Sequence, residues 1–210
     1  MFQTNKENNN GSLKFKKAFV TGATGFVGAN LVRELLSRDI SVTALVRKSS
    51  DLKNLEGLDL EVVYGDLQDK PSLLKAIARS KLVFHVAAEY SFWSPDPESI
   101  FKNNVDGTRN ILEACRELDV EKTVYTSTVG TIGLNPTNGG SSNEEIPLLE
   151  NQFTGPYKSS KYEVEKLVLE FAKSGLPAVL DAVNWYAERG YFKRFKKRSM
   201  KNEHTVSTSC

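Results

Sequence analysis

The chain has 210 residues, of which 40% are apolar and 26% are charged, and its formal net charge at pH 7 is +2. This balance is typical of a globular protein of one domain and a little more, and a charge so near neutrality gives no indication of a nucleic-acid partner. No apolar run reaches the length of a membrane-spanning helix. Two cysteines and two histidines are too few for a disulfide framework or a metal cluster, so we expect no metal and a reducing, cytoplasmic setting.

Residues 1–14 lack the apolar core of a signal peptide and are predicted to form a disordered leader. The next stretch, KKAFVTGATGFVG, predicts a short buried strand over 18–20, a sharp turn and a helix over 26–36. Its glycines stand three apart, which suits tight turning, close approach of a pyrophosphate and close packing of helix on strand. A glycine turn that binds nothing is the alternative, but its place at the start of an alternating β/α pattern favours a dinucleotide site. The expected cofactor contacts here are Gly22, Thr24, Gly25, Phe26, Val27 and Gly28.

A second strand is predicted over 41–46, and Arg47 follows it about 20 positions after Gly28. Sites that prefer NAD carry an acidic residue near this position, which accepts a hydrogen bond from the ribose 2′-hydroxyl. A guanidinium instead favours a 2′-phosphate, so the sequence predicts NADP(H) over NAD(H). The alternative is that Arg47 is merely an exposed charge at a strand end.

The third strand is predicted over 60–64, and Asp66 after it is a candidate N-cap for a helix that begins near Pro71. The fourth strand, 82–86, contains His85, interpreted as a packing residue, and runs into Ala87 and Ala88. These small residues leave room for the cofactor at the strand ends. The aromatic residues that follow either line a substrate pocket or pack beneath a loop: Tyr90, Phe92 and Trp93.

A helix is predicted over 98–118, a fifth strand over 123–127 and a long loop over 130–153. Another helix, 157–174, opens with Tyr157 and Lys161, which share one face because they are four residues apart. An ammonium one turn away, with the positive charge of a nicotinamide, would favour the phenolate of Tyr157 and lower its pKa. The hydroxyl of Thr128, or alternatively of Ser127, would contact the substrate oxygen.

These motifs, in this order, resemble the extended short-chain dehydrogenase/reductases, and among them the hopanoid-associated sugar epimerase and dihydroflavonol reductase-like group. The resemblance rests on TGATGFVG, GDL, NNVDGTRNILEAC, YTSTVGTIG and GPYKSSKYEVEKL. It implies an α/β doubly wound parallel sheet (Rossmann fold), with Asp66 and Leu67 beside the adenine. It further implies that Asn104 organises a proton relay, that Tyr157 is the acid/base, and that Lys161 tunes it and holds the nicotinamide ribose. Asn104 could equally be a polar residue that holds a local backbone bend.

The resemblance predicts a dinucleotide-binding domain over 15–180, with the family's C-terminal substrate lobe largely absent. The segment 181–192 resembles the last helix of the family, with Asp181 as its N-cap, and 193–210 reads as a solvated basic and polar tail. The expected activity is NADP(H)-dependent oxidation, reduction or epimerisation of a secondary alcohol or ketone. The alternative is an NADP(H)-binding module, or a truncated isoform, without turnover. A homodimer through helices 98–118 and 157–174 is expected by analogy with the family.

Overall fold

The computed structural model of the chain describes residues 15–90, 96–135, 142–143, 146–149, 152, 155–183 and 196–198. Its helices and short 3-10 turns, in chain order, are α1 (Phe26–Ser37), η1 (Lys53–Leu55), α2 (Lys70–Ile77), α3 (Pro97–Glu117), η2 (Val129–Thr131) and α4 (Gly155–Lys173). Its strands are β1 (Lys17–Thr21), β2 (Ser41–Val46), β3 (Glu61–Tyr64), β4 (Leu82–His85), β5 (Lys122–Thr128), β6 (Ala178–Val183) and β7 (Lys196–Arg198).

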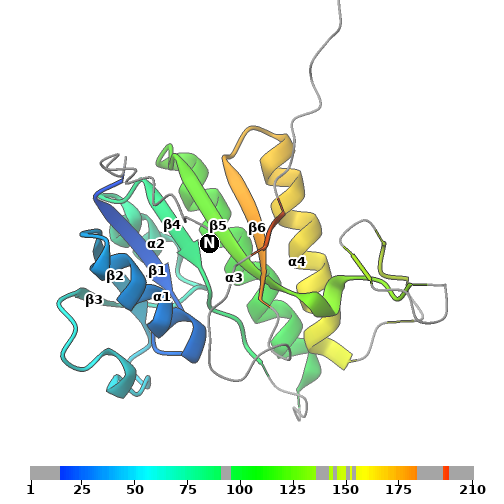
Figure 1. The fold of residues 1–210 in the computed structure, drawn as a ribbon, viewed down its shortest axis with the longest axis horizontal. Helices are drawn as coiled ribbons and strands as arrows, with labels where there is room; N and C mark the ends of the chain where they lie inside the picture. The colour runs from blue at the N-terminus through cyan, green and yellow to red at the C-terminus, as the bar shows by residue number, and fades with distance from the viewer. Residues whose placement is uncertain are drawn as a thin grey trace, which may run out of the picture.

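The strands form one sheet in the order β3-β2-β1-β4-β5-β6-β7 (Figure 1). The first six are parallel, and β7 joins β6 in the antiparallel direction. The chain winds from β1 toward one edge through β2 and β3, then returns to β4 and winds toward the other edge. The change of direction falls between β1 and β4, which is where ligands of doubly wound sheets bind. The predicted fold class is therefore confirmed.

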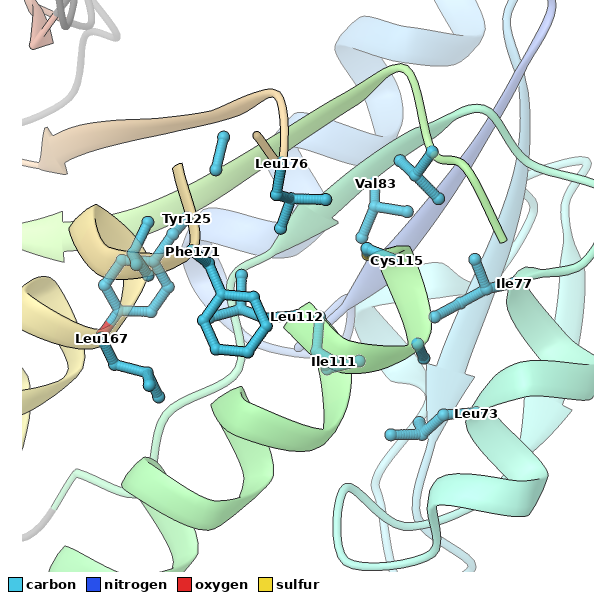
Figure 2. Close-up of a cluster of buried hydrophobic side chains, with 14 of the residues drawn as sticks. Leu73, Ile77, Val83, Ile111, Leu112, Cys115, Tyr125, Leu167, Phe171 and Leu176 are labelled. Carbon is cyan, nitrogen blue, oxygen red and sulfur yellow. The ribbon is translucent and has the colours of Figure 1, made fainter. Parts of the chain in front are cut away.

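Each face of the sheet carries its own apolar core, because successive side chains of a strand point to opposite sides. Ala18 and Val20 of β1 pack with α1, whereas Phe19 between them packs on the other face with α2, α3 and α4. The larger core brings together α2, α3, α4 and the strands β4, β5 and β6 (Figure 2). Burial on both faces explains why these strands read as nearly continuous apolar runs.

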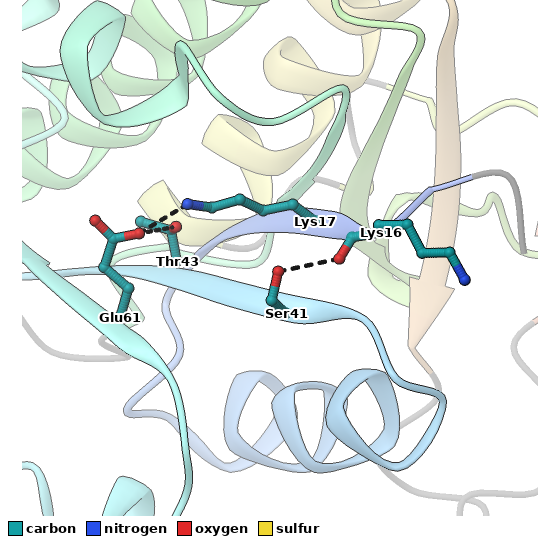
Figure 3. Close-up of polar contacts among 5 residues, drawn as sticks. All are labelled: Lys16, Lys17, Ser41, Thr43 and Glu61. Atoms are coloured by element: carbon teal, nitrogen blue, oxygen red, sulfur yellow. Dashed lines mark hydrogen bonds and ion pairs between the residues drawn. The ribbon is translucent and has the colours of Figure 1, made fainter.

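Polar contacts join the amino-terminal ends of β1, β2 and β3, away from the edge where ligands are expected (Figure 3). Glu61 accepts hydrogen bonds from Lys17 Nζ and from Thr43 Oγ1, each at 2.8 Å. Ser41 Oγ donates to the carbonyl oxygen of Lys16 at 3.0 Å. Hydrogen bonds from Lys17 and Thr43 lower the pKa of the Glu61 carboxyl. Side-chain hydrogen bonds as well as backbone pairing thus fix the register of β1, β2 and β3 at their amino-terminal ends.

The end of the sheet differs from the expectation at two points. A helix does not begin at Asp181, because residues 181–183 continue β6 and pair with residues 126–128 of β5. The reason is that β5 extends to Thr128, and the last backbone groups of β5 need hydrogen-bond partners. A longer β6 provides these partners. Within the predicted tail, Lys196–Arg198 form β7. The rest of the predicted helix, residues 184–192, lies outside the described residues.

Among the residues that the structure describes, none of the helices combines the length and the apolar character that a membrane span requires.

Candidate functional site

The glycine-rich loop between β1 and α1 lies at the switch point of the sheet. Gly22 has a φ of +70°, and a Cβ there would lie 2.6 Å from the backbone nitrogen of Ala87. A Cβ at Gly28 would collide with the carbonyl group of Gly22, only 2.7 Å from its carbon. Internal packing therefore requires both glycines, and together they let α1 begin close against β1 and the end of β4.

Gly25, the middle glycine, is not required by the fold in this way. Its φ is −77°, which any residue adopts, and an added Cβ would make an ordinary contact 3.4 Å from the Gly22 oxygen. It is the N-cap of α1, and the side chain of Phe26 beside it is 64% exposed. Internal packing does not require a glycine at position 25. The absence of a side chain there leaves room for another molecule to approach the N-terminus of α1. The loop therefore fits the pyrophosphate of a dinucleotide.

A side chain outside the predicted site holds the loop in place. Asn54 Nδ2 donates to the carbonyl oxygen of Thr24 at 2.8 Å, and Arg33 Nη2 donates to the carbonyl oxygen of Asn54 at 2.8 Å. Thr24 and Val27, two predicted contacts of the cofactor, are half-buried at this loop. The segment after β2 thus holds the backbone of the glycine loop in place.

The corner after β2 is a tight turn that begins at Arg47. Ser50 N–H donates to the carbonyl oxygen of Arg47 at 2.9 Å, and Arg47 N–H donates to Ser50 Oγ at 3.2 Å. The side chain of Arg47 is exposed. Because β2 is the direct neighbour of β1, the Arg47 turn and the glycine loop share one edge of the sheet. Arg47 therefore directly follows the end of β2, and its contact with a 2′-phosphate stays a prediction.

Asp66 and Leu67 follow β3 at the same edge. The prediction that Asp66 caps the next helix is wrong, since α2 is capped by Asp69, whose carboxylate accepts from Ser72 N–H. Asp66 Oδ1 instead accepts from Gln68 N–H at 2.8 Å, an Asx turn that leaves the exposed carboxylate at the sheet edge. The carbonyl oxygen of Leu67 accepts from Asn110 Nδ2 at 2.8 Å, which ties this turn to α3.

His85, at the end of β4, is completely buried in a chain of hydroxyl contacts. Its Nδ1 lies 2.7 Å from Thr21 Oγ1, and its Nε2 lies 2.9 Å from Thr108 Oγ1. Thr108 donates its only hydroxyl proton to the carbonyl oxygen of Asn104 at 2.7 Å. His85 Nε2 must then carry the proton that Thr108 accepts, and Nδ1 accepts from Thr21. Burial lowers the pKa of His85 to about 3, and the nearby Lys161 acts in the same direction.

Ala87 and Ala88 continue from β4 over the end of the glycine loop. Ala87 N–H donates to Thr21 Oγ1 at 3.2 Å, so the hydroxyl chain of His85 also fixes this backbone. Ala87 is half-buried against Gly22, and Ala88 is exposed. The two small residues therefore border the point between β1 and β4 where the winding of the sheet changes direction, and their contact with a cofactor stays a prediction.

Asn104 is buried in α3 and joins three segments of the chain. Its Oδ1 accepts from Glu89 N–H at 2.7 Å, and its Nδ2 donates to the Glu89 carbonyl oxygen at 3.1 Å and to Ser160 Oγ at 2.9 Å. Ser160 Oγ in turn donates to the carbonyl oxygen of Tyr157 at 2.8 Å. Asn104 thus connects the loop after β4 with the first turns of α4, a wider function than holding a bend in its own helix.

Tyr157 lies near the start of α4, and its ring meets that of Tyr90 edge-on, with the centroids 4.7 Å apart. The sequence predicted a lowered pKa for Tyr157. The structure shows the opposite for the chain by itself, because burial and the neighbouring Tyr90 raise the pKa of Tyr157 to about 12. At neutral pH the hydroxyl is therefore protonated and is a proton donor. Phe92 and Trp93, the other aromatic candidates, lie outside the described residues.

Lys161, one turn after Tyr157, is buried with 2% of its surface exposed. Its Nζ donates to the carbonyl oxygen of Thr126 at 2.7 Å and lies 4.4 Å from the centroid of the Tyr125 ring. Burial lowers the pKa of Lys161 to about 7, while Glu165 acts in the opposite direction. The amine therefore changes charge near neutral pH, beside the carboxyl end of β5.

The two candidate hydroxyls at the end of β5 lie on opposite faces of the strand. Ser127 is buried, and its Oγ donates to Glu165 Oε1 at 2.5 Å. Thr128 is half-buried, and its Oγ1 accepts from Gly130 N–H at 3.2 Å. The hydroxyl proton of Ser127 is already donated to the carboxylate of Glu165. The geometry therefore favours Thr128 as the hydroxyl that would contact a substrate.

Glu165, Ser160 and Asn54 contact residues of the candidate site, and they were not identified from the sequence. A signal was present for Glu165, because Tyr157, Lys161 and Glu165 follow one another at four-residue spacing and so share a helix face. A carboxylate on the face that buries Lys161 is unusual enough to be noticed. Nothing in the local sequence of Asn54 or Ser160 marks them, since their partners are backbone atoms and residues far along the chain.

Comparison with known proteins shows that the chain is similar to several reductases and epimerases. A protein of Synechocystis sp. provisionally named dihydroflavonol 4-reductase is 44% identical over 162 residues, which cover 77% of this chain and 47% of that protein. The 2-alkyl-3-oxoalkanoate reductase of Shewanella oneidensis is 35% identical over 161 residues, 77% of this chain and 40% of that protein. The structure of Thermus thermophilus UDP-glucose 4-epimerase in complex with NAD matches with a TM-score of 0.68 at 30% identity, over 78% of this chain and 53% of that one.

The sequence profile of the NAD dependent epimerase/dehydratase family matches residues 18–204, and the chain belongs to this family. The chain spans about half the length of the curated relatives named above.

Proposed function

We propose that the chain binds NADP(H) and that its site supports oxidation or reduction of a secondary alcohol or ketone. The observation that carries the proposal is the pair formed by Tyr157 and Lys161: a half-buried, protonated phenol stands one helical turn from a buried amine whose pKa is about 7. This pair lies on the helix beside β5, while the glycine loop lies two strands away at the end of β1. Groups of this kind can hold the substrate oxygen, donate a proton to it when a ketone is reduced and accept a proton from it when an alcohol is oxidised.

When bound, the nicotinamide supplies or accepts the hydride of the reaction. The residues that would hold the cofactor are those of the glycine loop, Arg47, the Asp66–Leu67 turn, Ala87 and Ala88, and Lys161. In the reducing direction Tyr157 donates its hydroxyl proton to the substrate oxygen, and its high pKa keeps that proton available at neutral pH. Lys161 stabilises the phenolate that remains, because its ammonium charge lies one turn away. Thr128 donates a hydrogen bond to the same substrate oxygen, and Asn104 keeps the start of α4 in position.

Replacement of Tyr157 by Phe tests this role. The variant keeps the ring and its contact with Tyr90 but has no proton to donate, so we expect ketone reduction to fall by at least about a hundredfold. The measurement is NADPH consumption with a series of ketones and dihydroflavonols, beside the control Tyr162→Phe on the same helix. NADPH affinity should stay within a few-fold of wild type. Wild-type turnover in Tyr157→Phe would refute the assignment.

The preference for NADP(H) is carried by Arg47 in the exposed turn after β2. Loss of a charge-assisted bond to the 2′-phosphate should weaken NADPH binding in Arg47→Ala by about tenfold or more and leave NADH binding nearly unchanged. Arg79→Ala removes the same charge from an exposed position after α2 and serves as the control. Dissociation constants from calorimetry decide the point. An equal effect of Arg47→Ala on both cofactors would show that the arginine is only an exposed charge.

A further inference from the structure

The carboxylate of Glu165 is buried in α4, with 6% of the residue exposed. Its Oε1 accepts from Ser127 Oγ at 2.5 Å and lies 2.7 Å from Thr131 Oγ1. Ser127 precedes Thr128 and Thr131 follows it in η2, so one oxygen atom holds the chain on both sides of Thr128. Thr131 Oγ1 is also 2.7 Å from the carbonyl oxygen of Thr128 itself. The segment that presents the Thr128 hydroxyl is therefore tied to α4 through Glu165.

Glu165 also lies one turn after Lys161 on the same face of α4. The groups around the Lys161 amine are the carbonyl oxygen of Thr126 and the Tyr125 ring on β5, His85 on β4, and Glu165 on α4. Tyr157 precedes Lys161 by one turn of the same helix. His85 is neutral and both tyrosines are protonated at pH 7, because burial shifts their pKa values away from neutrality. Among these named groups, Glu165 alone raises the pKa of the lysine. A buried cation needs such a partner, since an unpaired charge in the interior is strongly unfavourable.

We propose that Glu165 is a positioning residue with two tasks: through Ser127 and Thr131 it sets the hydroxyl of Thr128, and it supplies the counter-charge for the ammonium of Lys161. The inference rests on the proposed function for its catalytic consequence, but the contacts of Glu165 with Ser127 and Thr131 exist in the chain without any ligand. A purely structural carboxylate would satisfy the two hydroxyls and leave the charge state of Lys161 unchanged.

The test is the pKa of Lys161, measured by NMR titration of lysine side-chain signals in the purified chain. Glu165→Gln keeps the size of the side chain and an accepting oxygen but removes the charge. We expect the pKa of Lys161 to fall by about one unit or more. Glu163→Gln is the matched control: it makes the same change on the same helix at a position that pairs with the solvent-facing Lys166, and it should leave the pKa of Lys161 unchanged. An unchanged pKa in Glu165→Gln overturns the proposal.

A second variant keeps the test decisive if Glu165→Gln does not fold. The double variant Lys161→Met/Glu165→Gln removes both buried charges, so it should fold if the single variant fails because Lys161 lost its partner. If the double variant is also unfolded, the proposal that Glu165 is the counter-charge of Lys161 is overturned.

The positioning role is tested with Thr131→Val, which removes the hydroxyl that contacts both Glu165 and the Thr128 carbonyl oxygen and keeps the charge of Glu165. The pKa of Lys161 should stay near its wild-type value, whereas ketone turnover should fall by about tenfold with unchanged NADPH affinity. Wild-type turnover in Thr131→Val overturns this role. Failure of the proposed function has a different signature: the folded wild-type chain would not bind NADPH, while the NMR titration would still report on Glu165.

Discussion

Three glycines with equal spacing in the sequence have different functions in the loop after β1. Gly22 and Gly28 are required because a Cβ at either would collide with backbone atoms. Gly25 has ordinary room for a Cβ and an ordinary φ. The spacing predicted a phosphate-binding turn. Only the folded backbone shows that packing requires Gly22 and Gly28, whereas Gly25 would be required by a ligand.

This difference predicts opposite behaviour for two alanine variants. Gly28→Ala should lower the free energy of unfolding by about 2 kcal/mol or more, because backbone must move to admit the methyl group. Gly25→Ala should melt close to wild type and yet bind NADPH about tenfold more weakly or worse, since its methyl group would project toward the pyrophosphate. Thermal melts and calorimetric titrations of the two variants give the comparison. Tight NADPH binding by Gly25→Ala would contradict the assignment of this loop.

The buried imidazole of His85 predicts a pH dependence of stability. Its pKa is about 3 in the folded chain, against a reference value of 6.5 for the unfolded chain. Between these values the unfolded state binds a proton that the folded state does not, so stability is lost as the pH falls through 6.5. The loss attributable to this group is about 1.4 kcal/mol per pH unit.

Urea denaturation between pH 7 and about pH 5 measures this loss. His85→Gln has no titrating group at this position, and its unfolding free energy should depend less on pH by about the same amount. Equal pH dependence in wild type and His85→Gln would show that His85 is not held neutral in the folded chain.

At the scale of elements, α3 and α4 are joined by a buried amide. Asn104 of α3 bonds both backbone groups of Glu89 and the hydroxyl of Ser160 on α4. Asn104→Ala leaves these buried groups without their partner and should cost about 1–3 kcal/mol of unfolding free energy. Asn103→Ala is the control, because within the described part of the chain that side chain makes one solvent-exposed hydrogen bond, to the Glu89 carboxylate, and its loss should cost less than about 0.5 kcal/mol. Chemical denaturation distinguishes them, and equal costs would argue against the joining role of Asn104.

The elements themselves could be predicted well where apolar periodicity is long. The helix at 26–36 and the strand at 41–46 were predicted from the side chains alone, and the structure has them as Phe26–Ser37 and Ser41–Val46. The end of the sheet could not be predicted. Whether residues after Leu180 form a strand depends on the unpaired end of β5, a partner more than fifty residues earlier in the chain. In the same way, Asp69 rather than Asp66 caps α2 because the turn after β3 is closed by Asp66 itself.

For the whole molecule, the candidate site was predictable as a set of residue types but not as an electrostatic environment. The order of the motifs indicated that Gly25, Thr128, Tyr157 and Lys161 would gather at one edge of the sheet. The raised pKa of Tyr157 in the chain by itself could not be predicted, because it depends on the burial of the ring and on Tyr90. Burial of that kind is a property of the packed chain, since it arises from segments brought together by the sheet order.

The central claim is that the edge of the sheet near β1 and β4 binds a nicotinamide dinucleotide beside Tyr157. Calorimetric titration of NADPH into the purified, folded chain tests it most directly. We expect saturable uptake of one NADPH per chain. A well-folded sample that shows no saturable heat at any accessible NADPH concentration would contradict it.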